Sequence, residues 1–492
     1  MALFNKSDRG KKVIVHIGAE VVPYSKAGGL GDVVGILPQK MTEVVSDYRC
    51  IVITPYYRNI SKKINYLGKY EIPYSNVQYS YELYSDEKGG VEYFFIKMDD
   101  AFSVDNIYVD GSKPYLVDVG LEYFFFAKCI INLIGRMDIN PDAWITHDWH
   151  AAGIYCYIGG CHSVHIIHNY HHQGQLYNDI IQYLDPDVQK IAEEIYEESG
   201  YLSMNSFAIK MAERIVTVSP SYADELKCKK IAHPGLELFE LYNKDIRGIL
   251  NGVDYNKWNP SYDIGNFLEA KSEAKRHIKK EIGINTADSR PILLMMSRLT
   301  HQKGIDMFVN LYNRPPFDIF ERFGRIINTG CDFVICGVPA GGYSGEIDTQ
   351  LKQLMERYHE NFAYINYYND DMAADLLSGA DILLHISNYE PCGLTPMYAM
   401  RYGVVPLVSN TGGLSDIVRT GGFNGFAIDD LSFDNIIKEI KHIRSIYDDR
   451  EKFAELQKRC IREEFTWDKS VKQYCDIIES LLESEKNISV SC

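Results

Sequence analysis

Residues 12–32 read KVIVHIGAEVVPYSKAGGLGD and contain the pattern that decides the fold. The apolar run at residues 12–17 is typical of a buried parallel strand. The glycine-rich turn at residues 26–32 follows it and precedes a helical pattern. Glycines let the backbone approach a ligand closely, and a helix N-terminus offers free N–H groups to an anion. We interpret the stretch as the first strand, turn and helix of a layered α/β domain. A tight turn with a surface lysine, Lys26, is the alternative.

Short apolar runs recur along both halves of the chain and alternate with helical patterns. They lie at residues 50–54, 91–97, 143–146, 164–168 and 215–218, and again at residues 291–296, 332–336, 363–366, 382–385 and 405–408. This alternation predicts an α/β fold with two doubly wound domains. A length of 492 residues also exceeds what one compact core usually fills. We place the hinge between the domains near residues 250–265.

Each half contains a Gly-Gly-Leu turn with an aspartate two residues later, KAGGLGD at residues 26–32 and TGGLSD at residues 411–416. Two doubly wound halves that face each other would bring the carboxyl ends of both sheets to one cleft, where ligands bind. The echo is short, so chance similarity is the alternative to this interpretation.

The composition disfavours several classes of function. The formal net charge of −16 makes nucleic acid an unexpected partner and would repel an anionic membrane. The sequence contains no window of about 18 uncharged apolar residues, the length needed to span a bilayer. The first residues lack the apolar segment of a secretory signal. The 11 cysteines are scattered without a C-x-x-C pair, which indicates reduced thiols. We expect a cytoplasmic protein; a plastid would be equally compatible.

Two motifs in the second half carry groups suited to a departing diphosphate. The motif SRLTHQKG at residues 297–304 follows a strand and brings Arg298 and Lys303 to its carboxyl end. Two fixed cations can neutralise the charge that develops when a diphosphate leaves a sugar. The motif NYEPCGLT at residues 388–395 places Glu390 where a strand gives way to a helix. Its carboxylate can accept hydrogen bonds from sugar hydroxyls. The alternatives are a solvated basic loop and an acid that only stabilises a helix N-terminus.

Histidines cluster in HDWH at residues 147–150 and in HNYHH at residues 168–172. His-x-x-His and His-His pairs can ligate zinc. However, Asp148 and Trp149 interrupt the first group, and the usual spacings of a structural zinc site are missing. We therefore expect no metal site and interpret both clusters as groups that recognise sugar hydroxyls at strand ends.

Nine motifs follow one another in the order seen in glycogen and starch synthases, and together they cover nearly the whole chain. They are KAGGLGD at 26–32, HDWHAAG at 147–153, TVSPSY at 217–222, ILNGVD at 249–254, SRLTHQKG at 297–304, EPCGLT at 390–395, RYG at 401–403, TGGL at 411–414 and FTWD at 465–468. On these motifs the chain resembles the bacterial and plant branch of that family. The resemblance implies the GT-B fold, in which two Rossmann-like domains face a central cleft.

The resemblance also implies how the chain is divided. Residues 1–255 would form the N-terminal domain, which carries the glycine-rich loop on the acceptor side. Residues 256–465 would form the domain that binds the nucleotide sugar. Residues 466–492 would form a helix that crosses back to the N-terminal domain.

By the same resemblance, individual residues acquire expected roles. Arg298 and Lys303 would bind the diphosphate and stabilise its departure, and Glu390 would hold glucose hydroxyls. His168 and Asp148 complete the expected catalytic set. The residues expected to bind substrate are Lys26, Gly28, Gly29, Gly31, Asp32, Trp149, Asn251, Tyr368, Cys392, Gly393, Leu394 and Thr395.

The implied reaction transfers glucose from ADP-glucose or UDP-glucose to the non-reducing end of an α-1,4-glucan, with retention of the anomeric configuration. No strong nucleophile emerges for a double displacement, so the resemblance favours substitution on one face of the sugar, with the leaving phosphate taking the acceptor's proton. No cofactor and no metal are then expected. Tyr368, rather than its neighbour Tyr367, aligns with the aromatic residue that stacks on the donor base.

Two other functions remain open at this stage. One is another retaining GT-B transferase, of the sucrose- or trehalose-synthase type, and the EPCG motif at residues 390–393 argues against it. The other is a catalytically weak paralogue that binds polysaccharide, and the intact Lys26, Arg298, Lys303 and Glu390 argue against it.

The chain also departs from the family pattern in several places. These are Tyr170, His171 and His172 after the expected His-Asn pair, Ser206 in place of a lysine, Asn388 in place of an arginine and Pro396 in place of a glutamine. The departures leave the phosphate cations and Glu390 in place, and they bear on the choice of donor and acceptor.

Overall fold

The computed structural model describes residues 10–57, 60, 62–74, 77–98, 107, 117–176, 178–230, 233–311, 315–419 and 421–489. The chain groups into two compact units. Unit 1 comprises Met1–Asn251 and Trp467–Cys492, and unit 2 comprises Gly252–Thr466. The chain therefore passes between the units twice, and its last helix belongs with the first unit. In the described part of the chain, no helix has the length and apolar character needed to cross a membrane.

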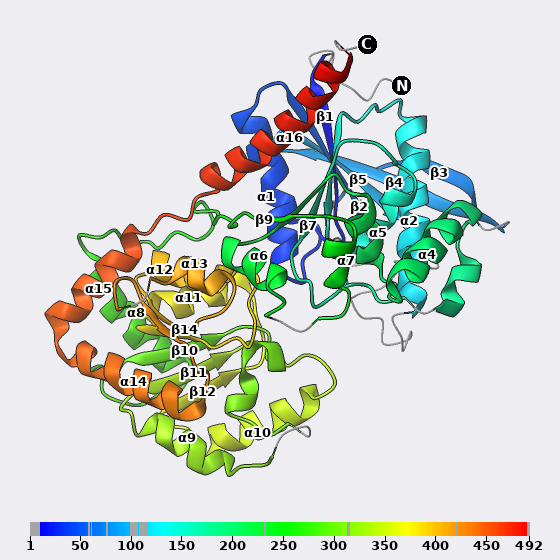
Figure 1. Ribbon diagram of the computed structural model, residues 1–492. Helices are drawn as coiled ribbons and strands as arrows, with labels where there is room; N and C mark the ends of the chain where they lie inside the picture. Colours follow the sequence, from blue (N-terminus) through cyan, green and yellow to red (C-terminus); the bar gives the residue numbers. More distant parts are fainter. Residues whose placement is uncertain are drawn as a thin grey trace. The chain divides into compact units, whose positions relative to one another are not determined.

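The described strands of unit 1 form one sheet in the order β3-β4-β5-β2-β1-β6-β7-β8-β9 (Figure 1). Their bounds are β1 (Lys12–Ile17), β2 (Tyr48–Pro55), β3 (Asn65–Tyr74), β4 (Val77–Lys88), β5 (Val91–Lys97), β6 (Ala143–His147), β7 (Ser163–Ile167), β8 (Arg214–Thr217) and β9 (Ile246–Gly248). β3, β4 and β5 pair antiparallel, and the other neighbours pair parallel. The parallel strands other than the edge strand β9 are largely buried on both faces, which is why they read as continuous apolar runs.

The helices of unit 1 connect and cover these strands. They are α1 (Gly29–Val44), α2 (Val117–Arg136), α3 (Asp148–Ala151), α4 (Pro186–Ser199), α5 (Met204–Met211), α6 (Pro220–Lys227), α7 (Glu237–Leu241) and α16 (Trp467–Ser489), with 3₁₀ turns η2 (Ala152–Cys156) and η3 (Asn178–Tyr183). α16 lies beside α1 (Figure 1). Glu479 anchors α16 by accepting hydrogen bonds from Lys12 Nζ at 2.6 Å and from Tyr48 Oη at 2.7 Å.

Ser206, which stands where the family pattern has a lysine, is part of the N-terminal cap of α5. Its backbone N–H donates to Ser203 Oγ at 3.2 Å, and its own Oγ accepts from the backbone N–H of Ser203 at 3.0 Å. Both serines are buried. The substitution therefore closes a capping box inside unit 1.

The described strands of unit 2 form a parallel sheet in the order β12-β11-β10-β13-β14-β15. They are β10 (Ile292–Met296), β11 (Asp332–Cys336), β12 (Phe362–Ile365), β13 (Ile382–His385), β14 (Val405–Ser409) and β15 (Phe426–Ile428). The helices around them are α8 (Phe267–Glu281), α9 (Ile319–Ile327), α10 (Ser344–Arg357), α11 (Asp370–Gly379), α12 (Leu394–Arg401), α13 (Gly413–Ile417), α14 (Phe433–Asp448) and α15 (Arg450–Arg462), with 3₁₀ turns η4 (His301–Lys303) and η5 (Ile305–Met307).

One face of α8 carries three buried lysines at a spacing of four residues. Lys271 Nζ donates to the carbonyl oxygens of Leu377, Ser378 and Tyr402, which lie at the C-terminal ends of α11 and α12. Lys275 Nζ lies 2.6 Å from the carboxylate of Asp381, and Lys279 Nζ lies 2.7 Å from that of Asp332. Since Asp332 begins β11 and Asp381 precedes β13, this lysine row ties α8 to the sheet.

Candidate active site

The strand order of each sheet reverses at one point, and the functional motifs follow the strands on either side of it. In unit 1 the order reverses between β1 and β6, and in unit 2 it reverses between β10 and β13. Ligands of open α/β sheets bind outside the carboxyl ends of the strands at such switch points. The glycine turn follows β1 and HDWH begins at the end of β6; SRLTHQKG follows β10 and NYEPCGLT follows β13.

At the switch point of unit 2, the partly buried Lys303 forms an ion pair with the buried Glu390. Lys303 Nζ donates to Glu390 Oε2. His385 Nε2 and Ser387 Oγ contact the same oxygen, each at 2.9 Å. Within the described part of the chain all three contacts are to Oε2, and none is to Oε1. The second oxygen therefore keeps its capacity to accept hydrogen bonds from a ligand.

The neighbours of Glu390 stabilise its ionised carboxylate. Burial by itself would raise the pKa of Glu390, but the Lys303 ammonium and the hydrogen bond from His385 outweigh burial and hold the pKa well below its usual range. Burial lowers the pKa of His385, against the raising effect of the Glu390 carboxylate. The ring of His385 is therefore neutral, and it donates from Nε2 to a fixed negative charge.

Backbone contacts join the two motifs of unit 2. The backbone N–H of Asn388 donates to the carbonyl of Gln302 at 2.8 Å, and Asn388 Nδ2 donates to the carbonyl of His301 at 2.6 Å. Gly304 has φ +76°, and a Cβ there would lie 2.3 Å from the carbonyl oxygen of Ile386. Asn388, a departure from the family pattern, thus helps to hold the lysine loop against the glutamate loop.

The second Gly-Gly-Leu turn supports the glutamate loop from behind. The backbone N–H of Gly413 donates to the carbonyl of Glu390 at 2.9 Å, and a Cβ on Gly413 would lie 2.2 Å from the carbonyl oxygen of Cys392. Cys392 and Gly393 are buried, whereas Leu394 and Thr395, which open α12, are partly exposed. Leu394 and Thr395 are therefore the more exposed of these four predicted residues.

Arg298 and Tyr368 occupy exposed loops at the same edge of the unit 2 sheet. Arg298 follows β10 and is exposed. Tyr368 follows β12 with 42% of its surface exposed, and its Oη donates to Asp370 at 3.2 Å. Its neighbour Tyr367 is 49% exposed, so exposure does not choose between the two tyrosines.

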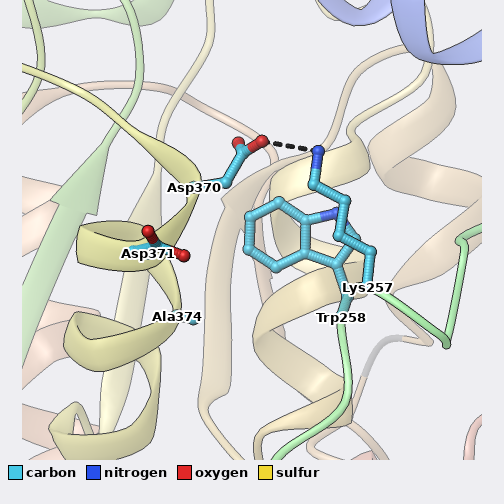
Figure 2. Close-up of a pocket in the computed structure, with 5 residues that line it drawn as sticks. All are labelled: Lys257, Trp258, Asp370, Asp371 and Ala374. Carbon is cyan, nitrogen blue, oxygen red and sulfur yellow. Dashed lines mark ion pairs between the residues drawn. The ribbon is translucent and has the colours of Figure 1, made fainter. Parts of the chain in front are cut away.

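A pocket of about 440 Å³ adjoins the loop that carries Tyr368 (Figure 2). It is lined by Lys257, Trp258, Asp370, Asp371 and Ala374. Lys257 Nζ lies 2.5 Å from Asp370 Oδ2, as the dashed line in Figure 2 shows. The Trp258 ring stacks on Tyr398 of α12, with centroids 4.1 Å apart. Asp370 therefore contacts both Tyr368 and the lysine of the pocket.

In unit 1, Glu20 organises the glycine turn. Glu20 is fully buried, and its Oε2 accepts hydrogen bonds from the backbone N–H groups of Ala27 and Gly28. A Cβ on Gly31 would lie 3.2 Å from the same oxygen. The N–H of Gly28 is thus used within the protein, while α1 begins at Gly29. Sequence reasoning missed Glu20, although its place just beyond the carboxyl end of β1 was a usable signal.

Lys26 and Asp32 form an ion pair across the turn, with Lys26 Nζ 2.8 Å from Asp32 Oδ2. Their side chains are 29% and 14% exposed, respectively. The lysine charge is therefore partly balanced within the protein and remains accessible to a ligand.

Asp148 opens α3 in a left-handed backbone conformation, with φ +57°. Its Oδ1 accepts from the backbone N–H of His168 at 2.6 Å and from that of Asn169 at 3.3 Å. Burial raises the pKa of Asp148 to about 7, against the lowering effect of these two hydrogen bonds, and the charge of Glu20 adds to the rise. The structure thus brings Asp148 and His168 together.

We expect Asp148→Asn to become more stable relative to the wild type as the pH rises. A folded pKa of about 7, above the ordinary 3.8, means that Asp148 adds stability below about pH 4 and loses it as the pH rises to about 7. The difference should grow by up to about 1.4 kcal/mol per pH unit in this window. Thermal unfolding of both proteins from pH 4 to pH 8 measures it, and parallel curves would contradict the assignment.

Three buried histidines line up at the carboxyl ends of β1, β6 and β7. His168 Nε2 lies 3.0 Å from His147 Nδ1, and His147 Nε2 lies 3.4 Å from His16 Nδ1. Burial lowers the pKa of His168 and of His16 to about 3, and it lowers that of His147 well below its ordinary value. The described residues contain no group of three or more His, Cys, Asp or Glu side chains arranged to hold a metal ion.

The remaining predicted residues of unit 1 are buried. Trp149 stacks on His150, with centroids 3.9 Å apart, and packs edge-on against Tyr123. Asn251 is 4% exposed, and its Oδ1 has no hydrogen-bond partner in the described part of the chain. Trp149 thus has a packing role within unit 1, whereas Asn251 carries an unused acceptor.

Comparison with known proteins places the chain in a family. The family model for the starch synthase catalytic domain matches residues 13–239, and that for glycosyl transferases group 1 matches residues 276–462. Proteins named glycogen synthase from Fusobacterium nucleatum and Flavobacterium johnsoniae are each 30% identical to this chain, over 96% of it and 100% of their own length.

A solved structure has the same fold. It is the catalytic domain of starch synthase IV from Arabidopsis thaliana bound to ADP and acarbose, with a TM-score of 0.82 and 24% identity over 96% of this chain and 100% of that chain. These similarities, together with two α/β units whose motifs gather at the strand switch points, show that the chain belongs to the glycogen and starch synthase family of hexosyltransferases and has the GT-B fold.

Proposed function

We propose that the enzyme transfers glucose from ADP-glucose to the non-reducing end of an α-1,4-glucan, with retention of the anomeric configuration. The observation that carries the proposal is the Lys303–Glu390 ion pair at the switch point of unit 2, which leaves Glu390 Oε1 open to a ligand. ADP as the leaving nucleotide is supported by the starch synthase IV structure, which was bound to ADP.

In this reaction the bond between the anomeric carbon and the diphosphate breaks, and a bond to the acceptor hydroxyl forms on the same face of the sugar. Lys303 and Arg298 neutralise the charge that grows on the leaving diphosphate. The departing phosphate takes the proton of the acceptor hydroxyl. Glu390 Oε1 accepts a hydrogen bond from a glucose hydroxyl, and its charge persists because Lys303 and His385 hold it.

Donor and product assays test the proposal directly. Purified protein is incubated with a glycogen primer and with ADP-glucose or UDP-glucose at matched concentrations, and kcat/KM is measured for each. The anomeric configuration of the new linkage is read from the proton coupling constant of the product. A preference for UDP-glucose would overturn the proposed donor, and a β-linked product would overturn retention. Failure to extend the glucan with either donor would support the polysaccharide-binding paralogue instead.

We expect Tyr368→Ala to raise the KM for the nucleotide sugar about fivefold or more, with a smaller change in kcat. Stacking of an aromatic side chain on a base contributes about 1–3 kcal/mol. Tyr367→Ala is the matched control, because it removes an equally exposed tyrosine from the adjacent position. If Tyr367→Ala raises KM and Tyr368→Ala does not, the base stacks on the other ring.

A further inference from the structure

His16, His147 and His168 form a row of rings in unit 1, the histidine row. The hydrogen bonds along this row must share one direction, because a neutral imidazole carries one proton and one lone pair. His147 stands in the middle and contacts a ring on each side, His168 at 3.0 Å and His16 at 3.4 Å. Both contacts can be hydrogen bonds only if each ring donates to the next in the same direction. Two arrangements satisfy this condition.

In the first arrangement, His16 donates from Nδ1 to His147 Nε2, and His147 donates from Nδ1 to His168 Nε2. The proton of His168 is then on Nδ1. In the second arrangement every proton is on Nε2, and His168 Nδ1 is a bare acceptor. The two arrangements therefore give His168 opposite chemical characters toward a ligand.

The far end of the row distinguishes the arrangements. His16 Nε2 is buried and has no hydrogen-bond partner in the described part of the chain. The first arrangement leaves a lone pair at this sealed position, whereas the second leaves an N–H group. Buried donors without a partner are rarer in proteins than buried acceptors whose capacity is not filled. The sealed end at His16 thus favours the first arrangement.

His168 is the end of the row that a ligand can reach. His168 Nδ1 makes no hydrogen bond within the described part of the chain and is not among its sealed polar atoms, and the residue keeps 9% of its surface exposed. The backbone N–H of His168 donates to Asp148 at 2.6 Å, which fixes the main chain at this point. Burial keeps the pKa of each ring in the row below its ordinary value, so each ring carries one proton near neutral pH.

We infer that His16 and His147 are positioning residues, which hold the proton of His168 on Nδ1 and so make His168 a hydrogen-bond donor to a sugar oxygen. The tautomer itself is inferred from contacts among described residues of unit 1. The sugar as the recipient of the hydrogen bond rests on the proposed function.

Nitrogen-15 NMR of protein labelled at histidine tests the tautomer without any substrate. We expect the His168 signals, assigned with His168→Gln, to show protonated Nδ1 and bare Nε2. In His147→Phe, which keeps a ring but removes both nitrogens, these signals should shift to a mixture of the two tautomers. His165→Phe is the matched control, because His165 is also buried on β7 but its Nδ1 lies 2.8 Å from Thr146 Oγ1, and in the described part of the chain it makes no hydrogen bond to the three histidines. Protonated Nε2 in the wild type, or an unchanged tautomer in His147→Phe, would overturn the inference.

A second variant and a kinetic measurement separate positioning from folding. His16→Phe, at the far end of the row, should also release the tautomer of His168. With glucosyl donors that each lack one hydroxyl, the wild type should lose about tenfold in kcat/KM, the scale of one hydrogen bond, for the analogue without the hydroxyl that His168 contacts, and His147→Phe should not; the loss for the hydroxyl that Glu390 binds should be the same in both proteins. The same selectivity in both proteins would contradict the inference. Absence of glucosyl transfer by the wild type would overturn the proposed function, and the NMR result would still decide the tautomer.

Discussion

Replacing Lys303 by alanine is expected to lower kcat about 100-fold or more while unit 2 stays folded. Loss of a fixed group that stabilises charge in the transition state typically lowers kcat by about 10²–10³. Lys303 is also the cation paired with Glu390, so the variant leaves that buried carboxylate with His385 and Ser387 as its partners. Both losses act on the transfer step, so the effect should appear in kcat more than in KM.

The pH dependence of the Lys303→Ala variant is an independent test of the pairing between Lys303 and Glu390. In the wild type the pKa of Glu390 lies below its usual range, because Lys303 and His385 outweigh burial. Without the ammonium, burial raises the pKa, so the variant should take up a proton at Glu390 at a higher pH than the wild type. The acid limb of its rate profile should therefore shift toward neutral pH.

Two further variants complete the test of the cation site. Arg298→Ala should also lower kcat about 100-fold, because the guanidinium is read as the second charge on the diphosphate. Lys352→Ala is the control, since Lys352 is an exposed lysine of unit 2 that pairs with Asp348 at 2.7 Å, one turn away on α10. Near-normal turnover in both Lys303→Ala and Arg298→Ala would remove them from the catalytic site.

Much of the fold was predictable from the sequence because parallel strands are buried on both faces. Each apolar run of the first and second halves overlaps a strand, and the carboxyl ends of β10 and β13 bring Lys303 and Glu390 together. The antiparallel β3 and β4 were not predicted, because many of their residues face solvent and interrupt the apolar pattern.

Contacts between distant residues explain what the sequence did not reveal. Glu20 stands just beyond the carboxyl end of β1, but only the folded turn brings the N–H groups of Ala27 and Gly28 to it. His16 belongs to an apolar strand, and only the pairing of β1 with β6 sets it beside His147. Both Gly-Gly-Leu turns open a helix at their second glycine, α1 at Gly29 and α13 at Gly413, but the sequence did not reveal that the second turn packs against the loop of Glu390.

The burial of the lysine row on α8 was also not predictable from the sequence, because a charged helical stretch is normally exposed to solvent. Here Lys279 is 3% exposed and meets Asp332, whose side chain is fully buried. Asp332 also accepts hydrogen bonds from Arg290 Nε at 2.9 Å, Thr286 Oγ1 at 2.5 Å and Asn361 Nδ2 at 3.2 Å. One carboxylate thus joins α8, the turn before β10 and the start of β11 and β12.

We expect Asp332→Ala to lower the free energy of unfolding of unit 2 by about 3–5 kcal/mol, because it leaves the buried Lys279 ammonium without a counter-charge. Asp434→Ala is the matched control: it removes an aspartate from an ion pair with Arg325 whose side chains are 80% and 44% exposed, and it should change stability by less than about 1 kcal/mol. Trp258 is the only one of the four tryptophans in unit 2, so the difference in fluorescence between each protein and its Trp258→Phe counterpart follows that unit in urea.

A double variant shows whether the unpaired charge is the cause. Lys279→Met combined with Asp332→Leu removes both ions and keeps apolar volume, and buried pairs replaced in this way often lose little stability. The double variant should therefore be more stable than Asp332→Ala alone. If it is equally unstable, the loss comes from the hydrogen bonds to Arg290, Thr286 and Asn361, and the lysine row contributes packing rather than charge balance.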